Sequence, residues 1–231
     1  MKLALVSDAG SDNGMATIHC VLNALRSNMT RVAYIASQPD PERTYYRATQ
    51  AIYRLLGVDL TLYLELESGF DAKVADAMFG FDAIHLSGGD TFRFLKWLKK
   101  RDLFTPLQTY LRDGGAVIGV SAGAMIMTPS IESARLCGDT NEVNLEDLSA
   151  MSLVPFQFVP HVDCDTKDAF MLFNQLVDEH SVFLPQLATP SIMALRKPVN
   201  EYYFCPDDAG IAVIDDELIE FGQPLLYRPN S

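Results

Sequence analysis

The sequence predicts an α/β protein with a mostly parallel sheet and helices on both of its faces. Short apolar runs alternate with longer stretches of helical periodicity, which is the order expected of successive β-α units. The 231 residues are 48% hydrophobic, which is enough to bury one substantial core. Neither an internal repeat nor a linker is found along the chain, so we expect one domain over residues 1–231.

Each expected element follows from its local pattern. The apolar run at 3–6 is typical of a buried strand, and the spacing after Asn13-Gly14 predicts a helix at 15–27. Up to residue 127, further strands are expected at 32–36, 60–66, 83–86 and 116–120, and further helices at 41–56, 72–79 and 122–127. A helical stretch is also expected from 92, with a second helical pattern that continues to 111. The last third predicts strands at 154–162, 192–195, 202–204, 211–214 and 218–221, and a helix at 167–177.

The charge balance argues against a nucleic-acid partner. The formal net charge is −12, whereas phosphate binding depends on clustered lysine and arginine. One basic cluster exists, and its spacing predicts the solvated face of a helix near its end. Its members are Lys96, Lys99, Lys100 and Arg101.

Cysteine usage and hydropathy indicate a cytoplasmic protein. Cys20, Cys137, Cys164 and Cys205 are far apart and form no CxxC pair, so neither a zinc site nor a disulfide framework is expected. The first apolar run is too short for a signal peptide, and no stretch approaches the length of a membrane span. No dinucleotide fingerprint occurs, and we expect no metal, organic cofactor or membrane contact.

Ser121 is the candidate nucleophile. It lies in the stretch Gly119-Val120-Ser121-Ala122-Gly123, which follows an apolar strand and begins a helix of small residues. Glycines at both ends permit the sharp strand-to-helix turn that exposes a serine hydroxyl. The Ala122 N–H, at the start of that helix, is then a candidate donor to an oxyanion.

A second glycine-rich turn, Ser87-Gly88-Gly89-Asp90, also follows an apolar strand and precedes a helix. The carboxyl ends of parallel strands meet at one edge of a sheet, so this turn can face Ser121. The Gly88 or Gly89 N–H can then complete an oxyanion hole. A plain helix cap at Asp90 and a phosphate-binding loop are the alternative interpretations of the turn.

The general base is sought among four histidines. His19 and His85 are expected to be packed residues of a helix and a buried strand, and His180 to interact with a helix end. His161 follows the apolar run that ends at Pro160, so it is favoured as the base.

The acid that would orient this imidazole is left open by the residues themselves. Asp163 and Asp165 follow His161 closely, but either can begin the next helix. Asp207 and Asp208 lie in a loop between two predicted strands, where one can orient a histidine and the other can form the turn.

Several of these motifs together resemble the peptidase E (aspartyl dipeptidase) and cyanophycinase family of serine peptidases. The resemblance spans about residues 30–165 and depends on four blocks. They are Tyr34-Ile35-Ala36-Ser37, Ser87-Gly88-Gly89-Asp90-Thr91-Phe92, Gly119-Val120-Ser121-Ala122-Gly123-Ala124 with Pro129-Ser130-Ile131, and Pro160-His161.

The resemblance implies a fold shared with class I glutamine amidotransferases, and a role for each matching residue. It implies Ser121 as nucleophile, His161 as base and Asp207 as acid. The implied oxyanion donors are the backbone groups of Gly89 and Ala122. The implied substrate contacts are Gly88, Asp90 and Thr91.

The chain also departs from the family pattern. Asp90 replaces the usual asparagine, which adds a negative charge that costs catalysis unless it caps the next helix. Leu136 stands where peptidase E relatives carry an aspartate, with Asp139 nearby, and the segment 189–204 is longer than in the smaller dipeptidases. These departures leave it open whether the chain cleaves after an N-terminal aspartate, as the resemblance to aspartyl dipeptidases implies.

The resulting hypothesis is a serine peptidase that hydrolyses small peptides as a monomer or homodimer. One alternative is a non-catalytic binding or regulatory protein on the same fold, which the charge of Asp90 keeps open. Another is an amidohydrolase or esterase with the same three side chains. A glutaminase is disfavoured because residue 121 is serine and not cysteine.

Overall fold

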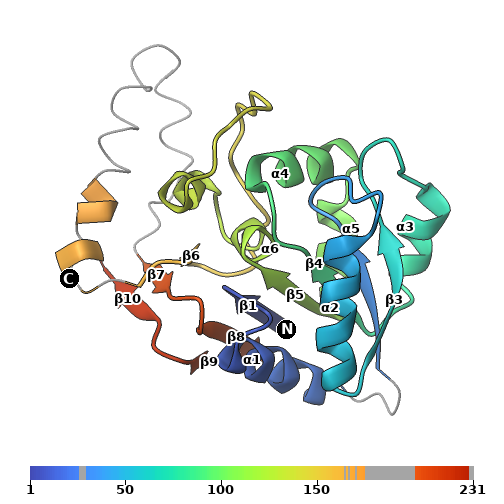
Figure 1. Ribbon diagram of the computed structural model, residues 1–231, viewed down its shortest axis with the longest axis horizontal. Coiled ribbons are helices and arrows are strands. Elements are labelled where there is room, and N and C mark those ends of the chain that lie inside the picture. Colours follow the sequence, from blue (N-terminus) through green and yellow to red (C-terminus); the bar gives the residue numbers. More distant parts are fainter. Residues whose placement is uncertain (26–29, 164, 166, 170, 175–200, 229–231) are drawn as a thin grey trace.

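The computed structural model describes residues 1–25, 30–163, 165, 167–169, 171–174 and 201–228 (Figure 1). Its helices are α1 (Asp12–Asn23), α2 (Thr44–Leu55), α3 (Ala72–Met78), α4 (Thr91–Lys100), α5 (Phe104–Arg112) and α6 (Ala122–Ile126), followed by a 3₁₀ helix at Glu132–Cys137. The strands are β1 (Lys2–Val6), β2 (Arg31–Ile35), β3 (Asp59–Leu64), β4 (Ala83–Leu86), β5 (Ala116–Val120), β6 (Gln157–Pro160), β7 (Tyr202–Cys205), β8 (Gly210–Ile214), β9 (Glu217–Phe221) and β10 (Leu225–Tyr227).

Within these residues the strands form two sheets. The larger has the order β3-β2-β4-β5-β1-β8-β9, and its first five strands are parallel to one another. Strands β8 and β9 extend it with antiparallel pairing. The smaller sheet has the order β10-β7-β6, in which β6 and β7 are parallel. The predicted mostly parallel sheet is confirmed.

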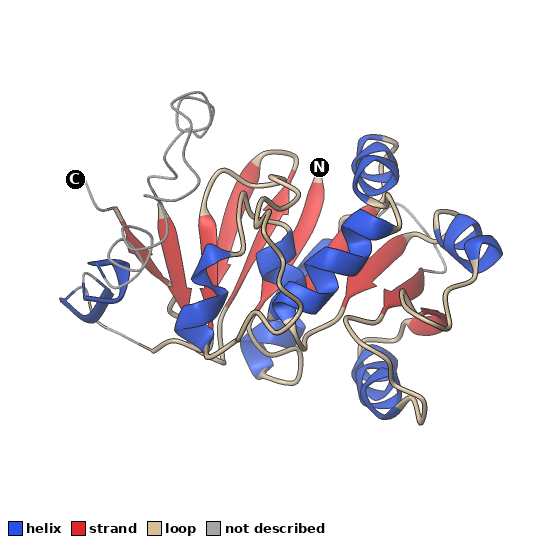
Figure 2. Cartoon of the chain, turned by 90° about the horizontal axis from the view of Figure 1, so that it is seen from above, coloured by secondary structure: helices blue, strands red, loops and turns tan. Residues whose placement is uncertain are grey.

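Helices cover both faces of the larger sheet (Figure 2). Alternate residues of β1 point to opposite faces, since the side-chain period of a strand is two. Leu3 and Leu5 pack in the core formed with α3 to α6, whereas Ala4 and Val6 pack in the core formed with α1 and α2. The structure is therefore a three-layer α/β sandwich, as predicted.

Two helix starts differ from the expectation because nearby side chains cap them. Helix α1 begins at Asp12 and not at 15, since the Ser11 hydroxyl accepts from the Gly14 amide at 3.0 Å. Helix α2 begins at Thr44 and not at 41, because the Asp40 carboxylate accepts from the amides that follow it.

The strand expectations are revised in three places. The run 60–66 forms a strand only to Leu64, and the run 154–162 forms one only at Gln157–Pro160. Strand β10 was not expected at all. The predicted strand at 192–195 and most of the second half of the predicted helix at 167–177 lie outside the described residues, and helical backbone is present at 167–169 and 171–174.

The basic cluster lies at the end of α4 as expected, but of its four members only Lys100 is exposed. Lys96 donates to the Val143 carbonyl at 3.0 Å, and Lys99 pairs with the Asp147 carboxylate at 2.7 Å. Arg101 donates to the Leu66 carbonyl at 2.7 Å. These cations therefore attach the loops around 66 and 143–147 to α4.

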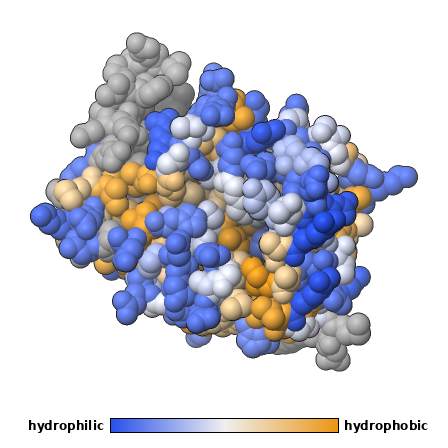
Figure 3. Space-filling model, viewed as in Figure 1, coloured by the Kyte–Doolittle hydropathy of each residue, from blue (hydrophilic) through white to orange (hydrophobic). Residues whose placement is uncertain are grey.

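The exposed face in Figure 3 is mostly hydrophilic, with smaller hydrophobic areas near the three-stranded sheet and beside α2. No helix in the described part of the chain is long and apolar enough to cross a membrane. The same residues contain no group of three His, Cys, Asp or Glu side chains that could hold a metal ion.

Candidate active site

Ser121 lies at a strained turn between β5 and α6. Its φ of 49° and ψ of −110° are rare for a residue with a side chain, and such strain is concentrated at functional sites. A Cβ on Gly119 would overlap the backbone of α6, and a Cβ on Gly123 would overlap the Leu86 carbonyl. Both glycines of the motif are therefore required by close backbone approach.

A continuous hydrogen-bonded chain joins Ser121 to two other side chains. Its Oγ lies 2.8 Å from His161 Nε2, and His161 Nδ1 lies 2.6 Å from Asp207 Oδ1. The imidazole is 43% exposed and the Asp207 side chain 71% exposed. The structure thus brings together the three residues selected above, which are 40 and 46 positions apart in successive steps.

The smaller sheet positions the histidine and the acid. Pro160 of β6 pairs with Cys205 of β7, and the Val162 amide continues the pairing with a 3.1 Å bond to the Cys205 carbonyl. His161, between them, has a φ of 62°, which turns its side chain out of the strand. Since Asp207 follows Cys205 by two residues, the parallel pairing of β6 and β7 places it beside His161.

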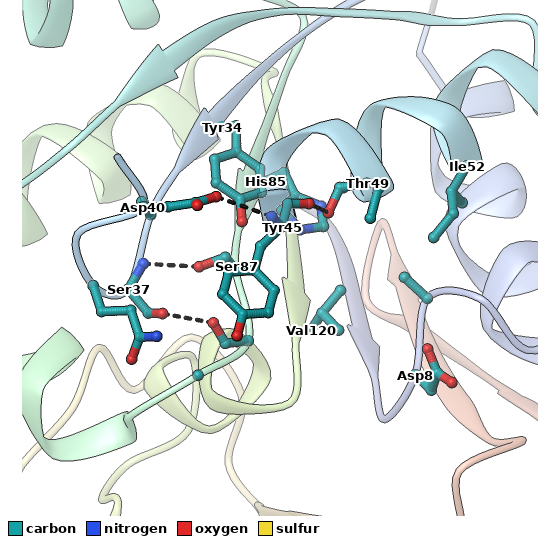
Figure 4. A pocket seen from close by; sticks show the side chains of 16 residues that line it. Asp8, Tyr34, Ser37, Asp40, Tyr45, Thr49, Ile52, His85, Ser87 and Val120 are labelled. Atoms are coloured by element: carbon teal, nitrogen blue, oxygen red, sulfur yellow. Dashed lines mark hydrogen bonds between the residues drawn. The ribbon is translucent and has the colours of Figure 1, made fainter. Parts of the chain in front are cut away.

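The turn after β4 lies next to Ser121. A Cβ on Gly88 would lie 3.5 Å from the Ser121 Cβ, and Gly89 has a φ of +126°, which favours glycine. The Ser37 hydroxyl donates to the Gly88 carbonyl at 2.6 Å (Figure 4). In a trans peptide the carbonyl and the N–H point in opposite directions, so this bond turns the Gly89 N–H away from Ser37.

Ser37 has a role at this turn that the sequence did not predict. It is 3% exposed, and its own amide donates to the Ser87 hydroxyl at 2.8 Å. The available signal was its place directly after β2, at the same sheet edge as the two glycine-rich turns. Across from it, the first amides of α6, including that of Ala122, have no intrahelical acceptor.

Asp90 caps α4. Its carboxylate accepts from the Arg93 amide at 2.9 Å, and the Asp139 carboxylate accepts from the Thr91 amide at 3.2 Å. Thr91 is 1% exposed and its hydroxyl contacts the Met125 sulfur, so its side chain belongs to the packing and offers no surface to a ligand. Asp139 thus places an acid beside the turn although Leu136 occupies the family position.

None of the competing acids is bonded to His161, and two of them have other partners. Asp208 accepts from the Asn13 amide at 2.8 Å and from the Asn13 side chain at 2.9 Å, which attaches the loop of Asp207 to α1. These bonds lower the pKa of Asp208, the backbone bond having the largest effect. Asp165 accepts from two amides of the following helical segment, and Asp163 makes no hydrogen bond to His161.

The other histidines are now distinguished. His85 is 2% exposed, as expected of a packed residue. His19 was expected to be packed but is exposed on α1, where Asn23 is its hydrogen-bond partner at 3.2 Å. The expectation was wrong because His19 lies on the side of α1 that faces away from the sheet. His180 lies outside the described residues.

A three-layer sandwich with a serine at a strained strand-to-helix turn beside a histidine is the arrangement found in α/β enzymes that use a serine nucleophile. The model of Peptidase family S51 matches residues 3–196. The chain therefore belongs to Peptidase family S51.

Individual relatives agree with this membership. The chain is 32% identical over 124 residues to an uncharacterized peptidase of Pasteurella multocida, covering 53% of this chain and 58% of that protein. It is 34% identical over 119 residues to peptidase E of Citrobacter koseri, covering 51% and 48%. The matched part thus spans about half the length of these curated relatives.

Solved structures show the same fold. A candidate peptidase E protein from Listeria monocytogenes EGD-e superposes with a TM-score of 0.65 at 23% identity, over 95% of this chain and 96% of that one. A peptidase from an acI-B1 Actinobacterium gives 0.59 at 13% identity, over 98% and 96%.

Proposed function

We propose that this protein is a serine peptidase that hydrolyses small peptides by acyl transfer. The observation that carries the proposal is the chain from Ser121 Oγ through His161 to Asp207, with distances of 2.8 and 2.6 Å. This is the order nucleophile, base and orienting acid that such a reaction requires. Membership of the peptidase family supports it.

In the proposed reaction His161 Nε2 accepts the Ser121 proton as Oγ attacks the scissile carbonyl carbon. Asp207 accepts the Nδ1–H bond, which fixes the tautomer and stabilises the imidazolium. The N–H groups of Gly89 and Ala122 donate to the developing oxyanion. His161 then gives the proton to the leaving amine, and water releases the acyl group by the reverse sequence.

The cap at Asp90 favours catalysis over the non-catalytic alternative. Its carboxylate is bonded to the Arg93 amide of α4, where the helix dipole offsets its charge. The helix therefore partly neutralises the negative charge that would otherwise oppose an oxyanion.

The test is covalent labelling with a fluorophosphonate probe followed by mapping of the adduct. Wild-type protein should be labelled at Ser121, and the Ser121→Ala variant should not be labelled. Peptide hydrolysis should fall by about 10⁴- to 10⁶-fold in Ser121→Ala and His161→Ala, as expected for groups that act as a unit. Absence of labelling under conditions that label a control serine hydrolase would support a non-catalytic binding protein.

Asp207→Asn should reduce kcat less, by about 10²-fold, because Asp207 is 71% exposed and water screens its charge. Comparison of matched ester and amide substrates distinguishes a peptidase from an esterase. We further propose a cytoplasmic monomer or homodimer that needs no cofactor; gel filtration with light scattering tests the oligomeric state.

A further inference from the structure

A cavity of about 290 Å³ adjoins Ser121 on the α2 side of the sheet (Figure 4). It lies between the ends of β1, β2 and β4 and the first turns of α2. Gly88, Gly89 and Val120 line it, and the first of these lies against the Ser121 side chain. Neither His161 nor Asp207 is among its lining residues. A group in the cavity is thus close to the nucleophile without occupying the place of the imidazole.

The charged side chains that line the cavity are both acidic. They are Asp8 and Asp40, and no lysine or arginine is among the described lining residues. Asp40 is 9% exposed, and its carboxylate accepts from three amides at the start of α2, so its charge is offset there. Asp8 is exposed; one of its oxygens accepts from the Gly10 amide at 2.8 Å. Its second oxygen has no hydrogen-bond partner within the described chain.

The cavity also contains a neutral polar group with a free position. His85 is 2% exposed and its Nδ1 lies 2.9 Å from the Tyr53 hydroxyl. Burial lowers its pKa to about 3, so the ring is uncharged at neutral pH. Among the described residues, its Nε2 has no hydrogen-bond partner. His85 therefore offers a polar contact to a ligand but no positive charge to a carboxylate.

The remaining wall suits an aliphatic stem. Ala48 and Ile52 of α2 line it, and the ring of Tyr45, which is 63% exposed, lies at its edge. Aliphatic stems of lysine and arginine pack on such surfaces while the charged end remains near water. The face of a tyrosine ring also attracts a cation.

At the neighbouring helix α4, the cation of the first turn is Arg93, and its guanidinium is already paired with the Glu67 carboxylate. The start of α4 is a natural place for an anion. The first amides there already donate to the carboxylates of Asp90 and Asp139. A third carboxylate at this point would be repelled by both.

We propose that this cavity binds a positively charged side chain of the residue on the acyl side of the scissile bond, with Asp8 as its partner. The inference depends on the proposed function of Ser121. The leaving amine must lie beside His161, which protonates it, and His161 does not line the cavity. The cavity is therefore assigned to the residue on the acyl side. The cation in the cavity is assigned to the side chain and not to the α-ammonium. The α-ammonium is only one carbon away from the reacting carbonyl, so it would leave the cavity empty.

The test uses dipeptides X-Ala in which X is lysine, Nε-acetyl-lysine, norleucine or aspartate. The wild-type kcat/KM for lysine should exceed that for norleucine and acetyl-lysine by about fivefold or more, the upper range for one partly solvated ion pair. Aspartate should be the poorest. Asp8→Asn should remove the advantage of lysine and leave norleucine unchanged. The matched control Asp76→Asn removes an exposed carboxylate from α3 and should keep it.

A preference for aspartate would overturn the proposal, and so would an advantage of lysine that persists in Asp8→Asn. The proposal also fails if Asp8→Asn lowers kcat/KM for all four dipeptides and if this loss disappears when their α-amines are N-acetylated. The partner of Asp8 would then be the α-ammonium and not the side chain. Calorimetric binding of the same dipeptides to Ser121→Ala separates the two proposals. If Ser121→Ala binds the lysine dipeptide most tightly but the wild type is not labelled at Ser121, the cavity binds a cationic side chain and the proposed peptidase activity is rejected.

Discussion

Ser37→Ala tests whether a buried hydroxyl fixes the orientation of the Gly88–Gly89 peptide in the proposed oxyanion hole. The Ser37 hydroxyl donates to the Gly88 carbonyl at 2.6 Å and is 3% exposed. Removing it leaves a buried carbonyl without this donor, which costs about 1–3 kcal/mol of folding stability. It also frees the Gly88–Gly89 peptide to rotate, and complete loss of one oxyanion donor costs about 10²- to 10³-fold in kcat.

Since rotation need not be complete, we expect kcat to fall by about 10- to 100-fold while KM changes little. The assay is steady-state hydrolysis of a dipeptide together with chemical denaturation. Tyr46→Phe is the matched control, because the buried Tyr46 hydroxyl also donates to a backbone carbonyl, that of Leu60 at 3.2 Å, away from Ser121. If both variants lose a similar free energy of unfolding and Ser37→Ala keeps its full kcat, the Ser37 hydroxyl does not orient the oxyanion donor.

Three further changes test other parts of the structure. Gly123→Ala should lower the melting temperature sharply and abolish probe labelling, because the new methyl group overlaps backbone of β4; an unchanged thermal unfolding curve would contradict this. Asn13→Ala removes the side-chain bond to Asp208 but keeps the bond from the backbone amide of residue 13, so it should loosen the loop of Asp207 and reduce kcat a few-fold with KM unchanged; an unchanged kcat would contradict this, and a fall in kcat that only follows the loss of folded protein would indicate a merely structural role. Burial by itself would raise the pKa of Asp147, but the bond from Lys99 and those from its neighbouring serine outweigh burial and hold it at about 2. Because the pKa of Asp147 is lower in the folded state, its stabilising effect is present above about pH 4 and is lost as the pH falls towards 2. The free energy of unfolding, measured by chemical denaturation, should therefore differ between wild type and Asp147→Asn at pH 6, and the two values should converge near pH 2.

The parallel half of the sheet was predictable because its signal is local. Continuous apolar runs with intervening helical periodicity occur where β1, β2, β4 and β5 form, and few other arrangements bury such runs on both faces. Boundaries were less predictable. The start of α2 depends on the Asp40 side chain and not on the periodicity that begins at Pro41.

The small sheet was not predictable from local pattern. Strand β6 pairs with β7, which is more than 40 residues away in the sequence, and β10 pairs with β7 in the opposite direction. Such pairing depends on long-range contacts that leave no periodic trace in either segment. For the same reason the local pattern left the acid partner of His161 open among Asp163, Asp165, Asp207 and Asp208, and the bond to Asp207 is a feature of the tertiary structure.

The fold class and the place of Ser121 could be predicted from the sequence, because a strand, two glycines and a small-residue helix are adjacent in the chain and need only local geometry. The sequence also indicated His161, since a residue at a strand end lies at the sheet edge. Three contacts could not be predicted from the sequence: the bond of Asp207 to the imidazole, the bond of Ser37 to the Gly88 carbonyl, and the place of Asp8 in a cavity beside Ser121. Each of these contacts joins separate loops at the carboxyl edge of the sheet, and the distance between two loops follows from strand order and register, which no single segment encodes.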